Sequence, residues 1–235
     1  MQLSERLKCV ADCVSPGNVA ADVGCDHAYT SIYLVKNDIA PHVYAMDVND
    51  GPVSRAEKNV RLYHCENQIT VIKSDGLKMI KPEYGVKSII ISGMGGTLIT
   101  DILGNSPQAH NGCGELILQP QSDVWKVRRW LHDNGYAISD EEMVYEDSKY
   151  YVIIKAVHGS EHYGENWEYL YGKLLADKKN DVFMNYLSDS LIKNRNIISD
   201  IEKTENKTQT QIACIESIKK KNRIIEHVWN LVKHE

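Results

Sequence analysis

The stretch Val19-Ala20-Ala21-Asp22-Val23-Gly24-Cys25-Asp26-His27-Ala28-Tyr29 constrains the fold more than any other part of the chain. Small apolar residues that end near Asp22 predict a short buried strand, and Gly24 permits a tight turn because it has no Cβ atom. The apolar residues after Tyr29 recur at the spacing of the inner face of a helix. A strand, a tight turn and a helix in this order are typical of the ligand-binding edge of an open α/β sheet.

The composition of the turn indicates which ligand it would bind. A turn that binds a dinucleotide usually has three glycines, because the pyrophosphate lies against bare backbone at a helix N-terminus. This turn has one glycine, flanked by Asp22 and Asp26, and two carboxylates would repel a pyrophosphate. They favour a cationic adenosine compound without phosphates, such as S-adenosylmethionine, which carries a sulfonium and an ammonium group. The alternative is a tight turn whose acids are simply solvated.

The next predicted strands also end in acids and glycines. Asp47 ends a strand predicted at 42–47, where an acid can accept hydrogen bonds from ribose hydroxyls. Its alternative role is to cap the next helix, although Asp50 and Pro52 are available for that. An acid after the strand predicted at 68–73 can accept a hydrogen bond from an adenine amino group. The predicted cofactor-binding residues are Asp22, Gly24, Cys25, His27, Asp47, Val48, Asp75, Gly76, Ser92, Gly93, Met94 and Gly95.

The order of the remaining elements predicts the fold class. A strand rich in apolar residues is predicted at 86–91, followed by a glycine-rich turn at 92–97, and a fifth strand at 115–118. A helix is predicted from Asp123 to Asn134, and then two antiparallel strands at 136–145 and 149–157. This order predicts a Rossmann-like α/β sheet of the class I methyltransferase type, with seven strands and a last antiparallel hairpin. We assign residues 1–159 to this catalytic domain.

Residues 160–235 have a different character and predict a second, helical domain. Apolar residues follow one another at steps of three and four over 184–201 and again over 215–232, as in the seam of a coiled coil. The two seams match in antiparallel order and bring Asn194 opposite Asn222, with the turn near Thr208. We therefore expect an antiparallel helical hairpin with one polar layer that fixes its register.

Two groups of basic residues are candidates for contacts with RNA. One group lies in the helix predicted at 123–134 and the other in the second half of the helical hairpin: Lys126, Arg128, Arg129, Lys219, Lys220, Lys221 and Arg223. The net charge of −5 argues against a protein that binds nucleic acid over its whole surface, but it permits local basic patches. The alternative is that these charges form the solvated face of a coiled coil.

The composition sets broader limits. The six cysteines form no C-x-x-C pair and no metal-ligand spacing with histidine, so we expect reduced thiols, no metal site and a cytoplasmic protein. The sequence shows no signal peptide and no apolar run of membrane-spanning length, so we expect no membrane partner. The oligomeric state stays open, with a monomer slightly favoured.

Several motifs resemble those of the bacterial tRNA (adenine(22)-N1)-methyltransferases. They cover nearly the whole first domain in the right order: Asp22 to Tyr29, Asp47 to Pro52, Ser74 to Leu77, Ser92 to Ile99 and Leu118 to Gln121. The resemblance implies a two-domain enzyme with a C-terminal coiled-coil hairpin, which moves a methyl group from S-adenosylmethionine to N1 of an adenine in the D-arm region of tRNA. One departure is Asp47, where many relatives carry glutamate; both acids can bind a ribose.

The predicted catalytic residues are Asp26, His27 and Tyr29. A carboxylate at Asp26 could accept a hydrogen bond from the adenine 6-amino group and stabilise the charge that develops on the ring. His27 could contact the base edge or the methionine carboxylate, and Tyr29 could stack on a flipped adenine. The alternative for Asp26 is that it only caps the following helix.

Two other functions stay open at this point. One is a methyltransferase that acts on a small molecule or a protein, and the other is a non-catalytic adenosine-compound-binding protein whose coiled coil recruits a partner. Enzymes that methylate exocyclic amino groups of bases usually carry Asn/Asp-Pro-Pro-aromatic after the fourth strand. Ser92-Gly93-Met94-Gly95 lacks this motif, which argues against N6 of adenine as the target.

Overall fold

The computed structural model describes residues 3–234 of the chain and divides into two compact units. The first unit ends at Tyr163 and the second begins at Gly164. The division lies four residues beyond the predicted 159/160 boundary, and local contacts explain the difference. The Glu161 carboxylate accepts a hydrogen bond from the Ile138 amide at 2.9 Å, and the Tyr163 ring packs edge-on against His132. Both residues therefore belong to the first unit.

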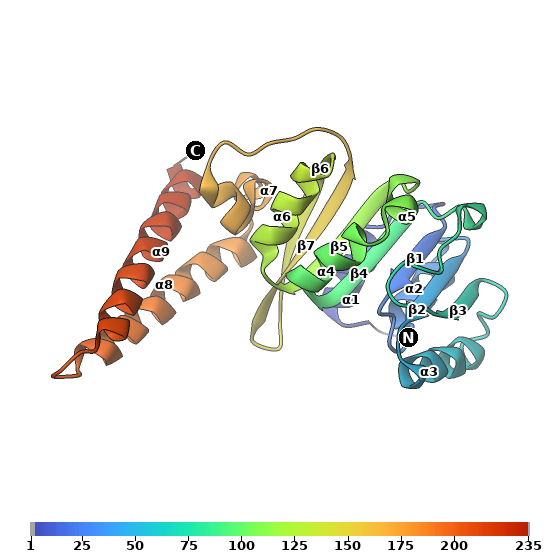
Figure 1. Ribbon diagram of the computed structural model, residues 1–235, viewed down its shortest axis with the longest axis horizontal. Coiled ribbons are helices and arrows are strands. Elements are labelled where there is room, and N and C mark those ends of the chain that lie inside the picture. The colour runs from blue at the N-terminus through green and yellow to red at the C-terminus, as the bar shows by residue number, and fades with distance from the viewer. Residues whose placement is uncertain (1–2, 235) are drawn as a thin grey trace. The chain divides into compact units, whose positions relative to one another are not determined.

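The first unit contains a seven-stranded sheet in the order β3-β2-β1-β4-β5-β7-β6 (Figure 1). Its strands are β1 (Ala20–Val23), β2 (Val43–Asp47), β3 (Ile69–Lys73), β4 (Ser88–Gly95), β5 (Glu115–Ser122), β6 (Tyr136–Glu146) and β7 (Lys149–His158). The first five strands are parallel, and β7 pairs antiparallel with both β5 and β6. This confirms the predicted Rossmann-like sheet with its antiparallel last hairpin. The chain order reverses beside β1, where open α/β sheets bind their ligands.

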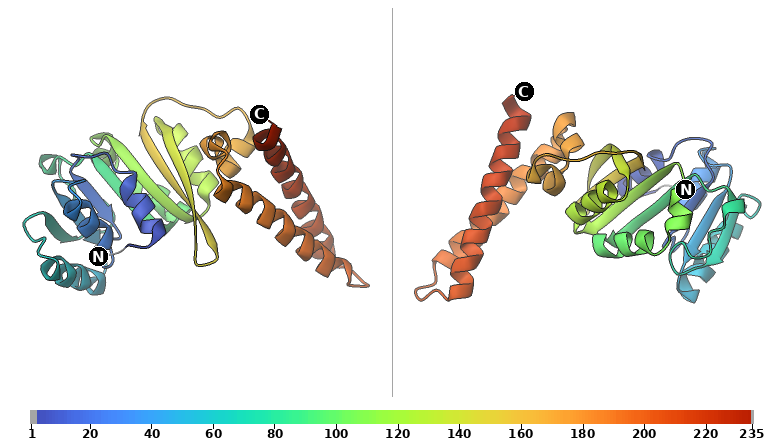
Figure 2. Two further views of the ribbon diagram at one scale, coloured as in Figure 1. Left: turned by 180° about the vertical axis from the view of Figure 1, so that it is seen from behind. Right: turned by 45° about the horizontal axis from the view of Figure 1, so that its top comes forward.

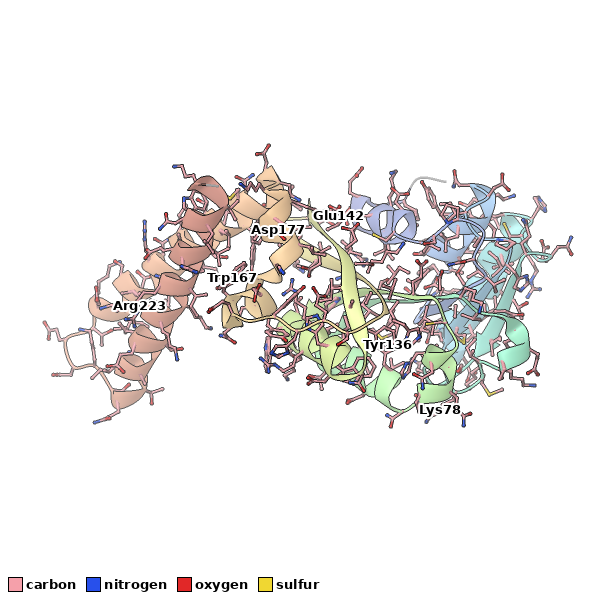
Figure 3. The ribbon with its side chains drawn as sticks, turned by 90° about the horizontal axis from the view of Figure 1, so that it is seen from above. Lys78, Tyr136, Glu142, Trp167, Asp177 and Arg223 are labelled. Carbon is pink, nitrogen blue, oxygen red and sulfur yellow. The ribbon has the colours of Figure 1, made fainter. Side chains whose placement is uncertain are left out.

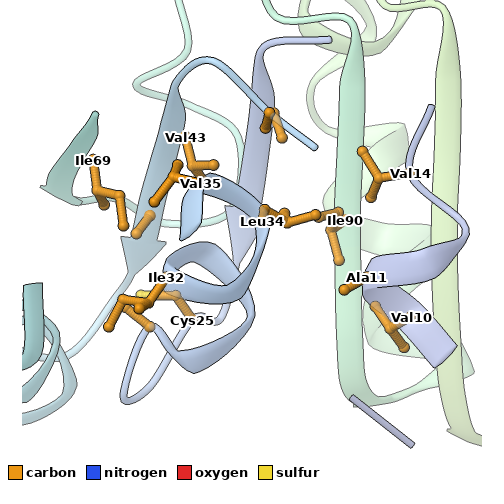
Figure 4. Packing of buried hydrophobic residues seen from close by; sticks show 14 of the residues in the cluster. Val10, Ala11, Val14, Cys25, Ile32, Leu34, Val35, Val43, Ile69 and Ile90 are labelled. Atoms are coloured by element: carbon orange, nitrogen blue, oxygen red, sulfur yellow. The ribbon is translucent and has the colours of Figure 1, made fainter. Parts of the chain in front are cut away.

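Helices cover both faces of this sheet. α1 (Glu5–Asp12), α2 (Tyr29–Lys36) and α3 (Asp50–Leu62) contact one another in series on one face. α4 (Gly96–Gly104), α5 (Pro107–Asn111) and α6 (Val124–Asp133) lie on the other, and a short 3₁₀ helix, η1 (Pro82–Tyr84), precedes β4. The core under α1 and α2 includes Val10, Ile32, Leu34 and Ile90, all with no exposed surface (Figure 4). Burial of this apolar surface is the main force that holds the helices on the sheet.

A polar cluster fixes the end of α1 at the base of the sheet. The buried Glu115 carboxylate, at the start of β5, accepts hydrogen bonds from the Ser15 amide at 2.7 Å and from the Ser88 hydroxyl at 2.7 Å. The Lys155 ammonium lies 3.0 Å from the same carboxylate and donates to the Cys13 carbonyl at 2.9 Å. These contacts hold the chain that follows α1, and they thereby orient the helix across the sheet.

The second unit is entirely helical over the residues that the structure describes. A π-helical turn, η2 (Glu168–Gly172), leads into α7 (Lys173–Lys178), which is followed by the long helices α8 (Asp181–Glu202) and α9 (Gln209–His234). α8 and α9 form an antiparallel hairpin whose connection includes Thr208 (Figure 2). The Asn194 side-chain amide donates to the Asn222 side-chain oxygen at 2.7 Å, which confirms the predicted polar layer.

Candidate functional site

A cavity of about 270 Å³ lies where β1 and β4 end, at the reversal point of the sheet. Its lining combines residues from α1, the β1–α2 turn, the end of β4 and the end of β5: Arg6, Leu7, Asp22, Gly24, Cys25, Asp26, His27, Tyr29, Thr30, Ser92, Gly93 and Gln121. Eight of the predicted site residues therefore share one cavity. Carboxylates and backbone dominate the turn side, and no phosphate-binding glycine cluster is present in that turn.

The β1–α2 turn has an unusual backbone conformation. Gly24, Asp26 and Ala28 have positive φ angles of 75°, 44° and 56°. A positive φ is open to glycine, tolerated by aspartate and costly for alanine, so surrounding contacts must hold the turn in this shape. The Gly24 amide donates to the Met46 carbonyl at 2.8 Å, and the Asn59 side chain donates to the His27 carbonyl at 2.9 Å. The turn is thus fixed by the two elements beside it.

Asp22 is the most buried acid of the site. Only 3% of its surface is exposed, and its carboxylate accepts a hydrogen bond from the Ser31 hydroxyl at 2.6 Å. Burial, with a smaller contribution from the nearby Asp47 charge, raises the pKa of Asp22 to about 6, against the lowering effect of the Ser31 hydrogen bond. A cation in the cavity would stabilise the ionised form of this carboxylate.

Asp26 lies in the turn with its carboxylate between the side chains of Arg55 and His27. The Arg55 guanidinium, from α3, is 2.5 Å from one carboxylate oxygen, and His27 Nε2 is 3.6 Å from the other. The α2 N-cap residue is Ala28, with no side-chain cap hydrogen bond. Asp26 therefore does not cap α2, and its carboxylate stays half-exposed at the cavity.

His27 and Tyr29 present two parallel rings to the same cavity. Their centroids are 5.4 Å apart and their planes differ by 7°. Tyr29 keeps 37% of its surface exposed. Flat, partly exposed rings of this kind can extend a stack to a purine base.

The end of β4 differs from the prediction. The strand was expected to stop at 91 before a glycine-rich turn, but pairing with β5 continues through Ser92, Met94 and Gly95, with register shifts on either side of Met94. The strand continues because β5 also runs four residues further than expected, to Ser122. Gly96 then begins α4 at a close crossing: a Cβ atom there would lie 2.6 Å from the Ser122 carbonyl oxygen.

The wall opposite the acidic turn is organised by a buried glutamine. Gln119 Oε1, from β5, accepts hydrogen bonds from the Arg6 guanidinium at 2.8 Å and from the Gly93 amide at 3.1 Å. The Arg6 guanidinium also lies over the Tyr151 ring, 5.3 Å from its centroid. Arg6 is the one lining residue of the cavity with a permanent positive charge.

The other predicted cofactor residues lie along the neighbouring strand ends, outside the lining of this cavity. Asp47 ends β2, and its carboxylate accepts a hydrogen bond from the Asn49 amide at 3.0 Å. Val48 is exposed, and Asp75 forms an ion pair with Lys78 beside Gly76. Met94 packs against Gly24, where an added Cβ atom would lie 2.2 Å from its terminal methyl group. Gly95 lies beside Ser122.

Four lining residues were not among the predicted site residues: Arg6, Leu7, Thr30 and Gln121. Gln121 lies in the Leu118–Gln121 motif, so a signal for it was present in the sequence. Arg6 and Leu7 belong to α1, in which no site residue was predicted. Only the tertiary fold brings that helix to the strand ends.

The structure contradicts the prediction that Arg128 contacts RNA. It is 1% exposed, and its guanidinium pairs with the buried Glu141 carboxylate at 2.7 Å. It lies on the inner face of α6, because that face is the one that packs on the sheet, and it cannot reach RNA. Arg129 is exposed, and Lys126 is half-buried beside Thr97 and Asp123. The other four candidates, Lys219, Lys220, Lys221 and Arg223, are exposed on α9.

Within residues 3–234, no helix has the length and apolar character needed to cross a membrane. The same residues contain no group of three or more His, Cys, Asp or Glu side chains that could hold a metal ion.

Comparison with known proteins connects this geometry to a family. A methyltransferase-domain family matches residues 3–154. The chain is 33% identical over 235 residues to the tRNA (adenine(22)-N(1))-methyltransferase of Bacillus subtilis, with 97% of this chain and 98% of that protein covered.

Two solved structures are similar over almost the whole chain. Sp1610 of Streptococcus pneumoniae, in complex with S-adenosyl-L-methionine, is 29% identical with a TM-score of 0.86, covering 97% of this chain and 100% of that one. TrmK of M. capricolum, in complex with S-adenosyl-homocysteine, is 28% identical with a TM-score of 0.83, covering 99% and 100%. The site, the fold and the full-length match agree, and the chain belongs to the tRNA (adenine(22)-N(1))-methyltransferase family.

Proposed function

We propose that this chain transfers the methyl group of S-adenosylmethionine to N1 of the adenine at position 22 of tRNA. The observation that carries the proposal is the acidic cavity at the reversal point of the sheet, in a chain that matches the Bacillus subtilis enzyme from end to end. The relatives' names supply the target atom and position, and the cavity supplies the chemistry that fits the methyl donor.

The residues of the cavity fit S-adenosylmethionine. Asp22 is a buried carboxylate that gains from a nearby cation, and the cofactor's ammonium and sulfonium groups are cations. Outside the lining, Asp47 ends β2, where an acid can accept hydrogen bonds from the ribose hydroxyls, and Asp75 lies just after β3, where an acid can accept one from the adenine amino group. Arg6 lies in the same lining and can pair with the cofactor's carboxylate.

The chemistry needs alignment more than proton transfer. Bound S-adenosylmethionine would supply an electrophilic methyl group. A bond forms between N1 of the target adenine and that methyl carbon, the carbon–sulfur bond breaks, and the positive charge moves from sulfur to the adenine ring. N1 of neutral adenine already carries a free lone pair, so no proton has to leave before the transfer. The task of the protein is therefore to hold the two groups in line.

Asp26, His27 and Tyr29 are the residues that we propose for the target base. The Asp26 carboxylate can accept a hydrogen bond from the 6-amino group and so stabilise the charge that forms on the ring. Its contact with Arg55 restrains the position of the carboxylate beside the cavity. Tyr29 offers a partly exposed ring for the base, which must leave its stack to reach the cavity.

The test is methylation of an unmodified tRNA transcript that carries adenine at position 22. We expect the modified position to be N1 of that adenine, mapped by primer extension because N1 methylation blocks base pairing. The matched control is the same transcript with guanine at position 22, which we expect to accept no methyl group. Methylation of both transcripts to the same extent, or of neither, would contradict the proposal.

A further inference from the structure

A second cavity, of about 280 Å³, lies within the helical unit. It is formed between the segment that precedes η2 and the outer face of α9, and its lining includes Glu165, Trp167, Lys220, Arg223, Ile224 and His227. Figure 3 shows Trp167 and Arg223 on these two neighbouring parts of the unit. None of these residues takes part in the methyl-transfer site.

The floor of this cavity is apolar and aromatic. Trp167 and Ile224 are half-buried, so each shows part of its apolar surface to the cavity. The Trp167 and His227 rings meet at 67°, with centroids 6.4 Å apart. The two rings meet edge to face and are not stacked in parallel. A half-exposed tryptophan in an open cavity is a platform for another flat ring.

Two cations flank this floor without a carboxylate partner. Lys220 and Arg223 are exposed, lie one turn apart on α9, and form no ion pair with any residue that the structure describes. Their neighbours differ: Lys219 lies 3.9 Å from the Glu202 carboxylate, and Arg195 lies 3.6 Å from that of Glu226. Glu165 is the one acid in the lining, where it can accept a hydrogen bond from a base amino group.

We propose that this cavity binds one unpaired nucleotide of the tRNA substrate. The base lies against Trp167, and its phosphate contacts Lys220 and Arg223. The inference rests on the proposed function, which makes tRNA the ligand. An aromatic ring flanked by unpaired cations is the combination by which proteins bind unpaired nucleotides, through stacking and phosphate contacts. Two uncompensated positive charges beside an aromatic floor match a nucleotide, which joins a flat base to an anionic phosphate.

The stacking contact is tested by Trp167→Ala and Trp167→Phe in the full chain. We expect Trp167→Ala to weaken the binding of unmodified tRNA about ten-fold in a filter-binding assay, because loss of one base–aromatic stack has an effect of this order. Trp167→Phe keeps a flat ring and should bind within about three-fold of the unsubstituted chain. Calorimetry with S-adenosylmethionine and thermal unfolding serve as controls, and neither should change.

The phosphate contact is tested by a double substitution that leaves the aromatic floor in place. Lys220→Ala with Arg223→Ala should reduce the slope of log affinity against log salt concentration by about one. The matched control is Lys193→Ala with Lys207→Ala, which removes one exposed and one partly exposed lysine of the same unit, both outside the cavity lining. We expect the control pair to change the slope much less.

Two results would overturn the proposal. One is tRNA affinity and salt slope that are unchanged by both Trp167→Ala and the Lys220/Arg223 substitutions. The other is a loss of self-association, measured by sedimentation, with tRNA binding unchanged, which would make this cavity a protein interface. Neither result concerns the reaction itself. Failure of the proposed function would instead appear as an unsubstituted chain that does not methylate adenine 22.

Discussion

Burial and the binding of a cation favour opposite protonation states of Asp22. Burial favours its neutral form and raises its pKa to about 6 from an ordinary value of 3.8, while a cationic ligand requires the ionised form. In the free protein, the folded state binds a proton more tightly than the unfolded state between these two values. The free energy of unfolding therefore falls as the pH rises from about 4 to about 6, by roughly 3 kcal/mol for this group.

These opposite preferences of Asp22 predict that the affinity for S-adenosylmethionine depends on pH. Below pH 6 the carboxylate of Asp22 must lose a proton when the cation binds, so the affinity for S-adenosylmethionine should fall by about ten-fold per pH unit. Calorimetry between pH 5 and pH 8 measures this. Asp22→Asn should bind more weakly at pH 8 and show a much flatter dependence. An equally steep dependence in Asp22→Asn would assign the titration to another group.

Asp26 carries the catalytic prediction. Asp26→Asn keeps the shape of the side chain but removes the charge that we propose for stabilising the target base, so we expect kcat to fall by about 10²-fold or more. The affinity for S-adenosylmethionine and the melting temperature should change little, because the side chain is half-exposed and does not cap α2. Single-turnover methylation of tRNA measures the effect.

The control for this substitution is Arg55→Gln. It removes the guanidinium that contacts Asp26 but leaves the carboxylate charge in place. We expect a smaller loss of kcat than in Asp26→Asn. Near-normal turnover in Asp26→Asn would leave alignment alone as the catalytic device, and the assignment of Asp26 would be wrong.

At the scale of elements, the α8–α9 hairpin depends on one polar layer for its register. The Asn194 side-chain amide donates to the Asn222 side-chain oxygen at 2.7 Å, and the hairpin also contains buried apolar residues such as Leu187, Ile218 and Ile225. Apolar layers of similar size are interchangeable, and sliding one helix by a turn would exchange one such layer for another. Only the correct register pairs the two amides, so the layer specifies the alignment.

The hairpin therefore gives a stability prediction. Asn194→Leu leaves the Asn222 amide without its partner and should lower stability by roughly 1 kcal/mol, since the layer is only half-buried. The double variant with Leu at both positions should recover or exceed the original stability, because an apolar pair replaces the polar one. Thermal unfolding monitored by circular dichroism compares the three. A double variant no more stable than Asn194→Leu would show that the amide pair does not couple.

The elements that the sequence predicted well have a strong periodic signal. The buried strands and the two heptad seams are of this kind, and the heptad spacing correctly placed Asn194 opposite Asn222. The extension of β4 through Gly95 was missed because glycine normally ends a strand, and only pairing with β5 keeps the chain extended there. Arg128 was misassigned because a basic residue predicts exposure, whereas the buried Glu141 that neutralises it lies on another element.

At the scale of the whole molecule, the sequence could predict the residues that each strand contributes to the site, but not the helix that brings a further side chain to it. Asp22, Asp26 and Gly93 follow from the rule that ligands bind at the carboxyl ends of parallel strands. Arg6 reaches the same cavity from a helix that precedes the sheet, held by Gln119 from the fifth strand. A contact between such distant parts of the chain has no local pattern, and it exists only after the sheet has formed.

The two compact units predict a division of labour that truncation can test. A chain that ends at Tyr163 keeps Glu161 and Tyr163 in their contacts with the first unit, whereas one that ends at residue 159 would lose both. We expect the chain that ends at Tyr163 to fold and to bind S-adenosylmethionine as the full chain does, since every residue that lines the cavity at the ends of β1 and β4 lies before Tyr163. The KM for tRNA should rise by about ten-fold or more, because the exposed cations of α9 are removed and each phosphate contact adds to affinity. Steady-state methylation of tRNA, with calorimetry for the methyl donor, separates the two effects. If the truncated chain binds tRNA as tightly as the full chain, the helical hairpin acts in dimerisation or in binding a protein partner, and the first unit holds tRNA by itself.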